Sequence, residues 1–404
     1  MTAPARAGLG LTLLLAALSM FGPFSIDTVF PAFESMGVQF AVDSTAMQQV
    51  TSVYLASFAV MTVFHGPLSD ALGRKPVMLA GIAMFTLASA GAALAPNLPV
   101  LLAFRVLQGM SAGAGQIVSR TVIRDLFHGA YAQRLMAQVA MIFGLAPAIA
   151  PVIGGYLLGF GPWPVIFWFL VAFGLLIGVG TLVVLPETLP PERRTPLRMR
   201  ELMRSMQIVA TDGPFARVAV ATAFMFGAQF LYIASAPIFV VDLLGKGERD
   251  FWIFFVPMIG GLIFGSWLTA RTAGIVAPQR MATYGMAMAC LGGLLNVSLA
   301  GAIDGVGGAH LPLLPWAVVG PCALTIGVAA TYPIMQLTFL DMHPERRGTG
   351  ASFGMSVSFV FNAILAGAVA PLVTSSLLEL AAASLILGLT GWALWAWHVR
   401  AGAS

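Results

Sequence analysis

Two oppositely charged residues lie inside apolar stretches of the chain, where charged side chains are costly and usually functional. Asp27 is four positions before Pro31, so on a helix it would lie about 6 Å inside the end of the first apolar stretch. Arg105 is six positions past Pro99, or about 9 Å inside the fourth stretch. These two stretches cross in opposite directions, so both charges fall at a similar depth. The pair is a candidate for proton transfer; the alternative is that Asp27 caps a helix near the outer surface.

An arginine stays charged when it is buried. It can therefore stabilise an ionised carboxylate and release that group once the acid takes up a proton. Arg105 is the natural partner of Asp27 in this chemistry.

A second group of charges lies in a short hydrophilic turn, residues 66–76, which reads Gly-Pro-Leu-Ser-Asp-Ala-Leu-Gly-Arg-Lys-Pro. It places three charges in eleven residues of a chain that is 9% charged overall: Asp70, Arg74 and Lys75. Gly66 is expected to let a neighbouring helix approach closely, and Gly73 to supply a backbone angle that other residues resist. The carboxylate of Asp70 can accept hydrogen bonds from a helix N-terminus or from an arginine. On spacing alone, an ordinary loop with a positive-inside signal is an equal alternative.

The elements that must hold these residues follow from length and composition. Of the 404 residues, 59% are hydrophobic, and the mean hydropathy is +0.91, more than a soluble domain needs. A spanning helix takes about 20 apolar residues, so the length accommodates about twelve. We predict an all-α polytopic membrane protein. The predicted spans are residues 9–30, 47–68, 77–94, 100–122, 135–158, 165–185, 215–240, 251–270, 281–300, 313–340, 351–373 and 378–399.

A polar stretch, residues 186–214, is the only long charged segment and separates six predicted spans from six. We therefore predict two pseudo-symmetric six-helix halves, residues 1–185 and 215–404, joined by a cytoplasmic loop. Residues 271–280 take the place in the second half that 66–76 take in the first, but they contain no aspartate. Gating chemistry is thus expected to be concentrated in the first half.

The basic residues sort strongly to one side when the spans alternate from an inside N-terminus. Only Lys246 and Arg249 fall outside, and Arg105 and Arg120 lie within the fourth span. The inside receives Arg6, Arg74, Lys75, Arg124, Arg134, Arg193, Arg194, Arg198, Arg200, Arg204, Arg217, Arg271, Arg280, Arg346, Arg347 and Arg400. This bias predicts that both termini lie in the cytoplasm.

The remaining composition excludes several other classes. The pI of about 9.4 is explained by topology and does not indicate nucleic-acid binding. The five histidines are scattered, so no metal site is expected. No nucleotide-binding loop appears, and no nucleophile lies at a recognisable spacing from a base, so we expect neither a cofactor nor catalysis. Cys290 and Cys322 lie in apolar runs and are expected to be small core residues.

The turn at 66–76 resembles the signature loop between helices 2 and 3 of the major facilitator superfamily. The matching residues are Gly66, Leu68, Ser69, Asp70, Gly73, Arg74 and Lys75. The resemblance implies that this loop gates the cytoplasmic side. It also implies that the carboxylate of Asp70 engages a helix start in the other half, here the small-residue segment 348–352, when the transporter faces outward.

The fourth span resembles one branch of that superfamily. Arg105 followed by Gln108 and Gly109 is similar to the family's helix 4 motif, which the resemblance links to proton coupling. Residues 119–127 look like a marker of the bicyclomycin-resistance (Bcr/CflA) group of drug:proton antiporters, as do 25–31 and 232–237. Three residues of that marker carry charge: Arg120, Arg124 and Asp125. The resemblance implies that they form a cytoplasmic charge network with Asp70; the alternative is that they simply anchor the helix at the membrane surface.

The fifth span resembles the antiporter motif of drug exporters. Its prolines and small residues predict a bendable helix with a smooth face: Pro147, Pro151, Gly154 and Gly155. Ala150 stands where the motif has its first glycine, which weakens the match slightly. The resemblance implies that this helix bends and seals at the interface between the halves.

A substrate pocket is expected near the midplane between the halves. Each polar or aromatic candidate for its lining is equally able to join helices to one another. These candidates are Tyr54, Gln108, Gln229, Tyr232, Tyr332, Gln336 and Asn362.

The leading hypothesis is proton-coupled efflux of small amphipathic compounds or drugs by a monomer in the bacterial inner membrane, powered by the proton gradient. A narrow-substrate metabolite exporter of the same fold is the alternative. A membrane-embedded enzyme and a channel are further possibilities, but an enzyme would show clustered catalytic residues. A channel would need neither two six-helix halves nor an arginine–carboxylate pair.

Overall fold

A computed structural model describes residues 9–127, 135, 139, 146–147, 149–272, 275–308, 310–343 and 347–401. Every regular element in this part of the chain is a helix. Ten of these helices are long and apolar enough to cross a membrane, and the bent pair Gly10–Gly22 and Phe24–Phe40 adds an eleventh if it forms one span. The first half of the predicted span 135–158 lies mostly outside the described residues, as do both chain ends. The predicted all-α polytopic fold is confirmed.

Contacts divide the chain into two compact units. Unit 1 comprises Met1–Asp43 and Val53–Met199, and unit 2 comprises Ser44–Ser52 and Arg200–Ser404.

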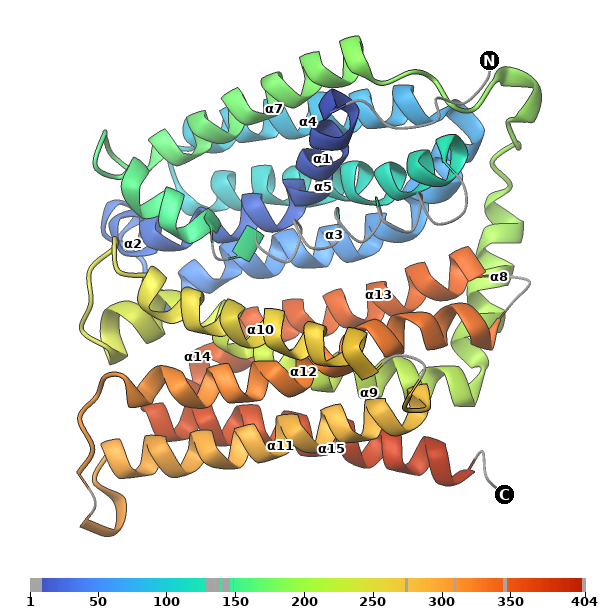
Figure 1. Cartoon of the computed structure of the whole chain (residues 1–404). Coiled ribbons are helices and arrows are strands. Elements are labelled where there is room, and N and C mark those ends of the chain that lie inside the picture. The colour runs from blue at the N-terminus through green and yellow to red at the C-terminus, as the bar shows by residue number, and fades with distance from the viewer. Residues whose placement is uncertain are drawn as a thin grey trace. The chain divides into compact units, whose positions relative to one another are not determined.

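Unit 1 is organised around α4 and α5. Helix α4 packs against α5 and α7, and α1 packs against α5 and α7 (Figure 1). The close packing depends on glycine: a Cβ on Gly81 would lie 2.7 Å from the Cβ of Ala114 on α5. Helix α5 begins where the side chain of Asn97 accepts a hydrogen bond from the backbone N–H of Val100 at 3.1 Å. The helices of this unit are α1 (Leu9–Asp27), α2 (Phe33–Phe40), α3 (Ser44–Leu72, whose first residues belong to unit 2), α4 (Arg74–Ala93), α5 (Leu98–Leu126) and α7 (Pro164–Val184).

Unit 2 has its tightest packing between α11 and α12. A Cβ on Gly292 would lie 2.5 Å from the backbone nitrogen of Leu324, so the two helices meet backbone to backbone. Helix α9 packs against α15 and α13, and α10 packs against α12. The helices of this unit are α8 (Met199–Thr211), α9 (Gly213–Ala234), α10 (Trp252–Thr272), α11 (Pro278–Ile303), α12 (Trp316–Met342), α13 (Arg347–Ile364), α14 (Ala370–Val373) and α15 (Leu377–Ala401).

The first predicted span is shorter than expected. Helix α1 ends at Asp27, a single 3₁₀ turn follows at Phe30–Ala32, and α2 then continues. Pro31 has no N–H to donate to the turn before it, which favours a break in the regular helix at this point. Asp27 therefore lies at a break in the helix rather than in its interior.

The predicted turn at 66–76 is wrong in its extent. Helix α3 continues to Leu72 and α4 begins at Arg74, so Gly73 alone connects them. Gly73 has φ +106° and ψ 153°, a region almost restricted to glycine, as the sequence predicts. Among the described residues, no atom outside the local helix backbone lies within 4 Å of the position of a Cβ on Gly66.

The charged segment 186–214 is not a loop throughout. It contains a 3₁₀ turn at Pro191–Arg193 and the 13-residue helix α8, which runs across the long helices of unit 2 (Figure 1). Leu202, Met206 and Val209 recur at helical spacing on one face, and Val209 is buried. Sequence inspection missed this helix because its charged residues, Arg200, Glu201 and Arg204, mask the periodic apolar residues.

The seventh predicted span, 215–240, is also interrupted. Helix α9 ends at Ala234, and a π-helical segment follows at Ile238–Leu243. Pro237 lies between them and lacks the N–H that a continuous helix requires.

Candidate functional site

The buried charges of unit 1 meet where α1, α3, α4 and α5 come together. Asp27 is 3% exposed and Arg105 is 0% exposed, so neither side chain reaches the surface. Their carboxylate and guanidinium groups interact electrostatically. A charge pair this deeply buried is costly unless further hydrogen bonds satisfy it.

Arg105 is held from several directions. Its Nη1 donates to the carbonyl oxygen of Ser25 at 3.1 Å, to the hydroxyl of Ser25 at 3.4 Å and to Oε1 of Gln108 at 2.9 Å. Its guanidinium carbon lies 4.5 Å from the ring centroid of Tyr54, a cation–π contact. The Tyr54 hydroxyl in turn donates to the carbonyl oxygen of Gly22 at 3.2 Å.

The network extends to α4 through the amide of Gln108. Its Nε2 donates to the hydroxyl of Ser89 at 2.7 Å, and that hydroxyl donates to the carbonyl oxygen of Phe85 at 2.8 Å. Tyr54 and Gln108, predicted as substrate contacts, are fully buried in this network. Sequence inspection missed Ser25 and Ser89, because a serine in an apolar helix carries no signal of its partner.

Glycines on α5 allow the other helices to approach this network. A Cβ on Gly109 would lie 2.2 Å from the carbonyl oxygen of Tyr54, and one on Gly115 would lie 2.8 Å from that of Leu18. Helix α5 therefore presents a flat surface for close helix contact.

The predicted antiporter-motif residues lie beside the end of α1. Pro151, Gly154 and Gly155 are buried, and Pro147 is half-buried. A Cβ on Gly154 would lie 2.1 Å from the carbonyl oxygen of Thr28, the residue that follows Asp27. The motif and the buried acid are thus adjacent, which the sequence alone does not reveal. Much of the motif's N-terminal half, including Gly144, lies outside the described residues.

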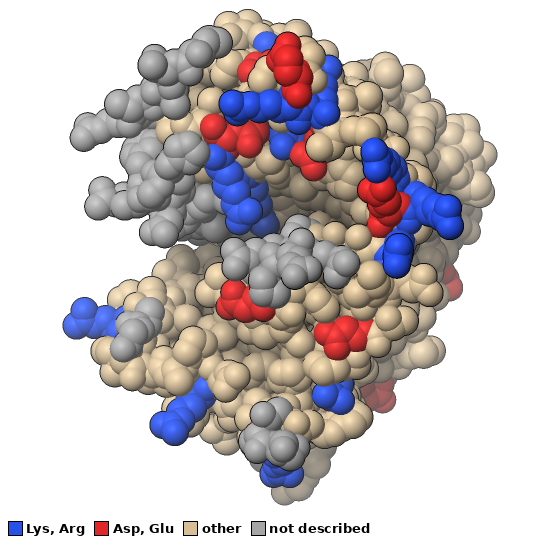
Figure 2. Space-filling view, turned by 90° about the vertical axis from the view of Figure 1, so that its right-hand side faces the viewer, with Lys and Arg blue, Asp and Glu red and all other residues tan. Residues whose placement is uncertain are grey.

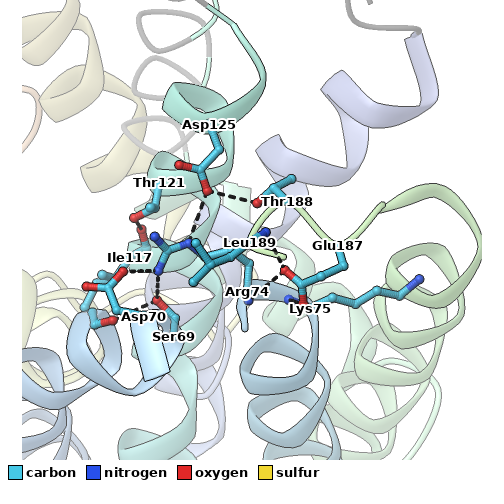
Figure 3. Close-up of polar contacts among 11 residues, drawn as sticks. Ser69, Asp70, Arg74, Lys75, Ile117, Thr121, Asp125, Glu187, Thr188 and Leu189 are labelled. Carbon is cyan, nitrogen blue, oxygen red and sulfur yellow. Dashed lines mark hydrogen bonds and ion pairs between the residues drawn. The ribbon is translucent and has the colours of Figure 1, made fainter. Parts of the chain in front are cut away.

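A second polar cluster lies at the other end of unit 1, around Arg74 (Figure 3). Its Nη1 donates to the Asp70 carboxylate and, at 2.7 Å, to the hydroxyl of Ser69, while its Nε donates to Oδ2 of Asp125 at 3.2 Å. The hydroxyl of Thr188 donates to the same Asp125 oxygen at 2.9 Å. Arg74 is 6% exposed, so one guanidinium joins the ends of α3, α4 and α5. Figure 2 shows acidic and basic side chains close to one another on the face that it draws.

The segment after α7 completes this cluster. Glu187 accepts hydrogen bonds from the backbone N–H groups of Arg74 at 3.1 Å and Lys75 at 3.3 Å, the first two residues of α4. Gly73 has no side chain with which to cap the helix, so Glu187 supplies the cap. The N–H of Thr195 donates to the carbonyl oxygen of Asp70 at 3.1 Å. Sequence reasoning missed Glu187 because more than 100 residues separate it from the helix that it caps.

The predicted cytoplasmic network therefore has Arg74 at its centre. Asp125 is one of its members, as expected. Arg120 is half-buried and Arg124 is exposed, both near the end of α5. Lys75 extends along α7, and its Nζ donates to the carbonyl oxygen of Leu182 at 2.8 Å.

The remaining candidates lie in unit 2 and do not form one cluster. Tyr232 is 2% exposed, and its hydroxyl accepts a hydrogen bond from Nδ2 of Asn296 at 2.7 Å. Gln229 and Asn362 are also buried, at 4% and 1% exposure, and Gln336 is half-buried. Asn296 was not predicted.

Tyr332 lies at a small cavity between α9 and α12. The cavity has a volume of about 10 Å³, room for a single water molecule. The ring of Phe226 lies 5.1 Å from that of Tyr332. The cavity lining consists of Thr222, Met225, Phe226, Val328, Thr331, Tyr332 and Met335.

Comparison with known families decides the class of protein. The model of the Major Facilitator Superfamily matches residues 12–371, nearly the whole chain. The chain belongs to this superfamily. It is a multi-pass membrane transporter and not an enzyme.

Relatives of this superfamily member carry names of drug transporters. The Bicyclomycin resistance protein homolog of Haemophilus influenzae is 28% identical over 363 residues, covering 89% of this chain and 88% of the relative. The Multidrug resistance protein MdtM of Escherichia coli strain K12 is 25% identical, covering 84% and 81% of the two chains. An uncharacterised transporter of the superfamily, YdgK of Bacillus subtilis, is 33% identical, covering 66% and 67%.

Solved structures of the superfamily have the same fold. A bacterial homolog of the human lysosomal transporter Spinster has a TM-score of 0.72 and 15% identity, covering 98% of each chain. A D-xylose-proton symporter has a TM-score of 0.70 and 14% identity, covering 95% of this chain and 97% of that structure.

Proposed function

We propose that this transporter exports small amphipathic compounds in exchange for protons by alternating access. The observation that carries the proposal is the buried pair of Asp27 and Arg105, held in a polar network inside an apolar bundle. A titratable carboxyl in such a place is functional by default. The names of the relatives, which refer to bicyclomycin and to multiple drugs, support the substrate class.

In this proposal Asp27 takes up a proton from outside and releases it inside. Arg105 stabilises the ionised carboxylate, and it is set free from that interaction when the acid is protonated. The antiporter-motif helix lies against residue 28, so a change at Asp27 is transmitted to a bendable helix. Substrate and proton compete for the state that the carboxylate stabilises.

The cluster around Arg74 is proposed to form the cytoplasmic gate. Asp70 engages the other half when the transporter faces outward, as its family signature implies. Arg74, capped at its backbone by Glu187, holds Asp70 and Asp125 in place for that contact. The gate is thus a preorganised group of charges at one helix junction.

We also propose an oligomeric state, a membrane location and an energy source for this transporter. The protein is a monomer of the bacterial inner membrane, with both termini and residues 186–214 in the cytoplasm, because the basic residues sort to that side. The proton gradient supplies the energy, and no cofactor or nucleic-acid partner takes part.

The decisive experiment is drug flux in proteoliposomes with an imposed pH gradient. Asp27→Asn mimics the protonated carboxyl permanently, so uphill accumulation should be lost, while the protein stays folded and downhill flux survives. Glu34→Gln removes an exposed acid seven residues away and should transport normally. Substrate-induced proton release from the purified protein is measured in parallel. Uphill pumping and proton release by Asp27→Asn would place the coupling site elsewhere.

A further inference from the structure

The buried charged and polar side chains limit which net charge a substrate can carry. Among the acids that the structure describes, Asp27 is the only buried one. The sequence contains no Asp or Glu from 126 to 186, so the partly described fifth span adds none. Among the described residues, Asp27 is therefore the one buried carboxylate that could attract a cation.

That carboxylate does not stand alone. Arg105 is held by Ser25, by Gln108 and by the ring of Tyr54, so its guanidinium is fixed against the last turn of α1, two residues before the acid. The pair has no net charge when Asp27 is ionised, and a charge of +1 when Asp27 is protonated. At no point in a proton cycle does it present a net negative charge.

The buried polar groups of unit 2 are neutral hydroxyls and amides. They are accompanied by many aromatic rings, such as Phe226 and Tyr332. Groups of this kind hydrogen-bond and stack with uncharged molecules but do not neutralise a cation. Among the described residues they are Gln48, Thr51, Thr222, Gln229, Tyr232, Ser235, Asn296, Thr325, Thr331, Ser358, Asn362, Thr374 and Ser384.

We propose that this transporter selects uncharged amphipathic molecules with hydrogen-bonding groups and rejects permanent cations. The proposal rests on the proposed function and narrows its substrate class. It has an electrical consequence. Exchanging an uncharged molecule for protons moves positive charge inward, so a membrane potential alone drives export.

The transport test uses proteoliposomes and probes of defined charge. Bicyclomycin and chloramphenicol are the uncharged probes, and tetraphenylphosphonium is the permanent cation. Transport of an uncharged probe should respond to a potassium–valinomycin potential without a pH gradient. Transport of the cation should be at least about tenfold slower. Equal rates for the cation and the uncharged probes would overturn this inference and leave proton-coupled export standing, whereas transport of no probe would count against the proposed function.

A binding test decides the charge argument independently of transport. The purified wild-type protein should bind tetraphenylphosphonium weakly. Arg105→Gln removes the guanidinium, so at alkaline pH, where the Asp27 carboxyl is ionised, binding should tighten by about tenfold or more. The double variant Arg105→Gln with Asp27→Asn should lose that gain. Wild-type binding as tight as that of Arg105→Gln would show that Arg105 does not exclude cations. Size-exclusion profiles confirm that each variant is folded.

Discussion

The one-residue connection at Gly73 gives the sharpest test of how the Arg74 cluster is built. In Gly73→Ala, a Cβ would lie 2.6 Å from Oε2 of Glu187 and 2.9 Å from Nη2 of Arg194. The backbone at φ +106° and ψ 153° is itself strained for any residue with a Cβ. The substitution should therefore both strain the junction and push Glu187 off the first turn of α4.

The expected loss follows from these two effects. The backbone strain costs about 1–3 kcal/mol. Loss of the cap on α4 adds about 0.5–2 kcal/mol. Because part of the strain can relax once Glu187 has moved, we expect a total loss of about 2–4 kcal/mol in the free energy of unfolding.

Equilibrium unfolding in mixed detergent–lipid micelles, followed by tryptophan fluorescence, measures this loss. Gly66→Ala is the matched control. It lies inside α3 with no atom within 4 Å of the new Cβ, so it should be neutral or stabilise by about 0.5–1 kcal/mol. Glu187→Ala removes the cap but keeps Gly73, and should lose only about 0.5–2 kcal/mol. If Gly73→Ala were as stable as Gly66→Ala, this would refute both the backbone strain at residue 73 and the capping of α4 by Glu187.

Three further predictions test the gate, the topology and unit 2. Asp70→Asn should weaken closure of the cytoplasmic side, and spectroscopic distances there should shift toward the inward-facing population; unchanged distances together with unchanged transport would remove Asp70 from the gate. Single cysteines replacing Arg198 and Lys246 should be labelled by an impermeant thiol reagent in intact cells only at 246, and labelling at 198 would overturn the topology. Asn296→Leu should destabilise the protein by about 0.6–2 kcal/mol, because the buried hydroxyl of Tyr232 loses its donor; an unchanged unfolding midpoint would show that this hydrogen bond contributes nothing.

The sequence by itself determined the class of protein and the position of most spans. Apolar runs of about 20 residues admit one structure in a bilayer, the helix, because every backbone N–H and C=O must be satisfied within the segment. Gly73 was also readable from the sequence, because a glycine between two helices indicates a special backbone angle. Asp27 and Arg105 stood out for the same kind of reason: charges in apolar runs are rare.

Only the tertiary structure decided which groups those residues contact. Ser25, Ser89 and Asn296 are ordinary polar residues in the sequence, and their partners lie on other helices. Glu187 caps α4 from a segment beyond α7, a contact that no local pattern encodes. Tyr54 and Gln108 both contact Arg105, an arrangement that their positions in the sequence do not reveal. Periodicity shows which face of a helix is apolar; which neighbouring helix covers that face depends on how the whole bundle packs.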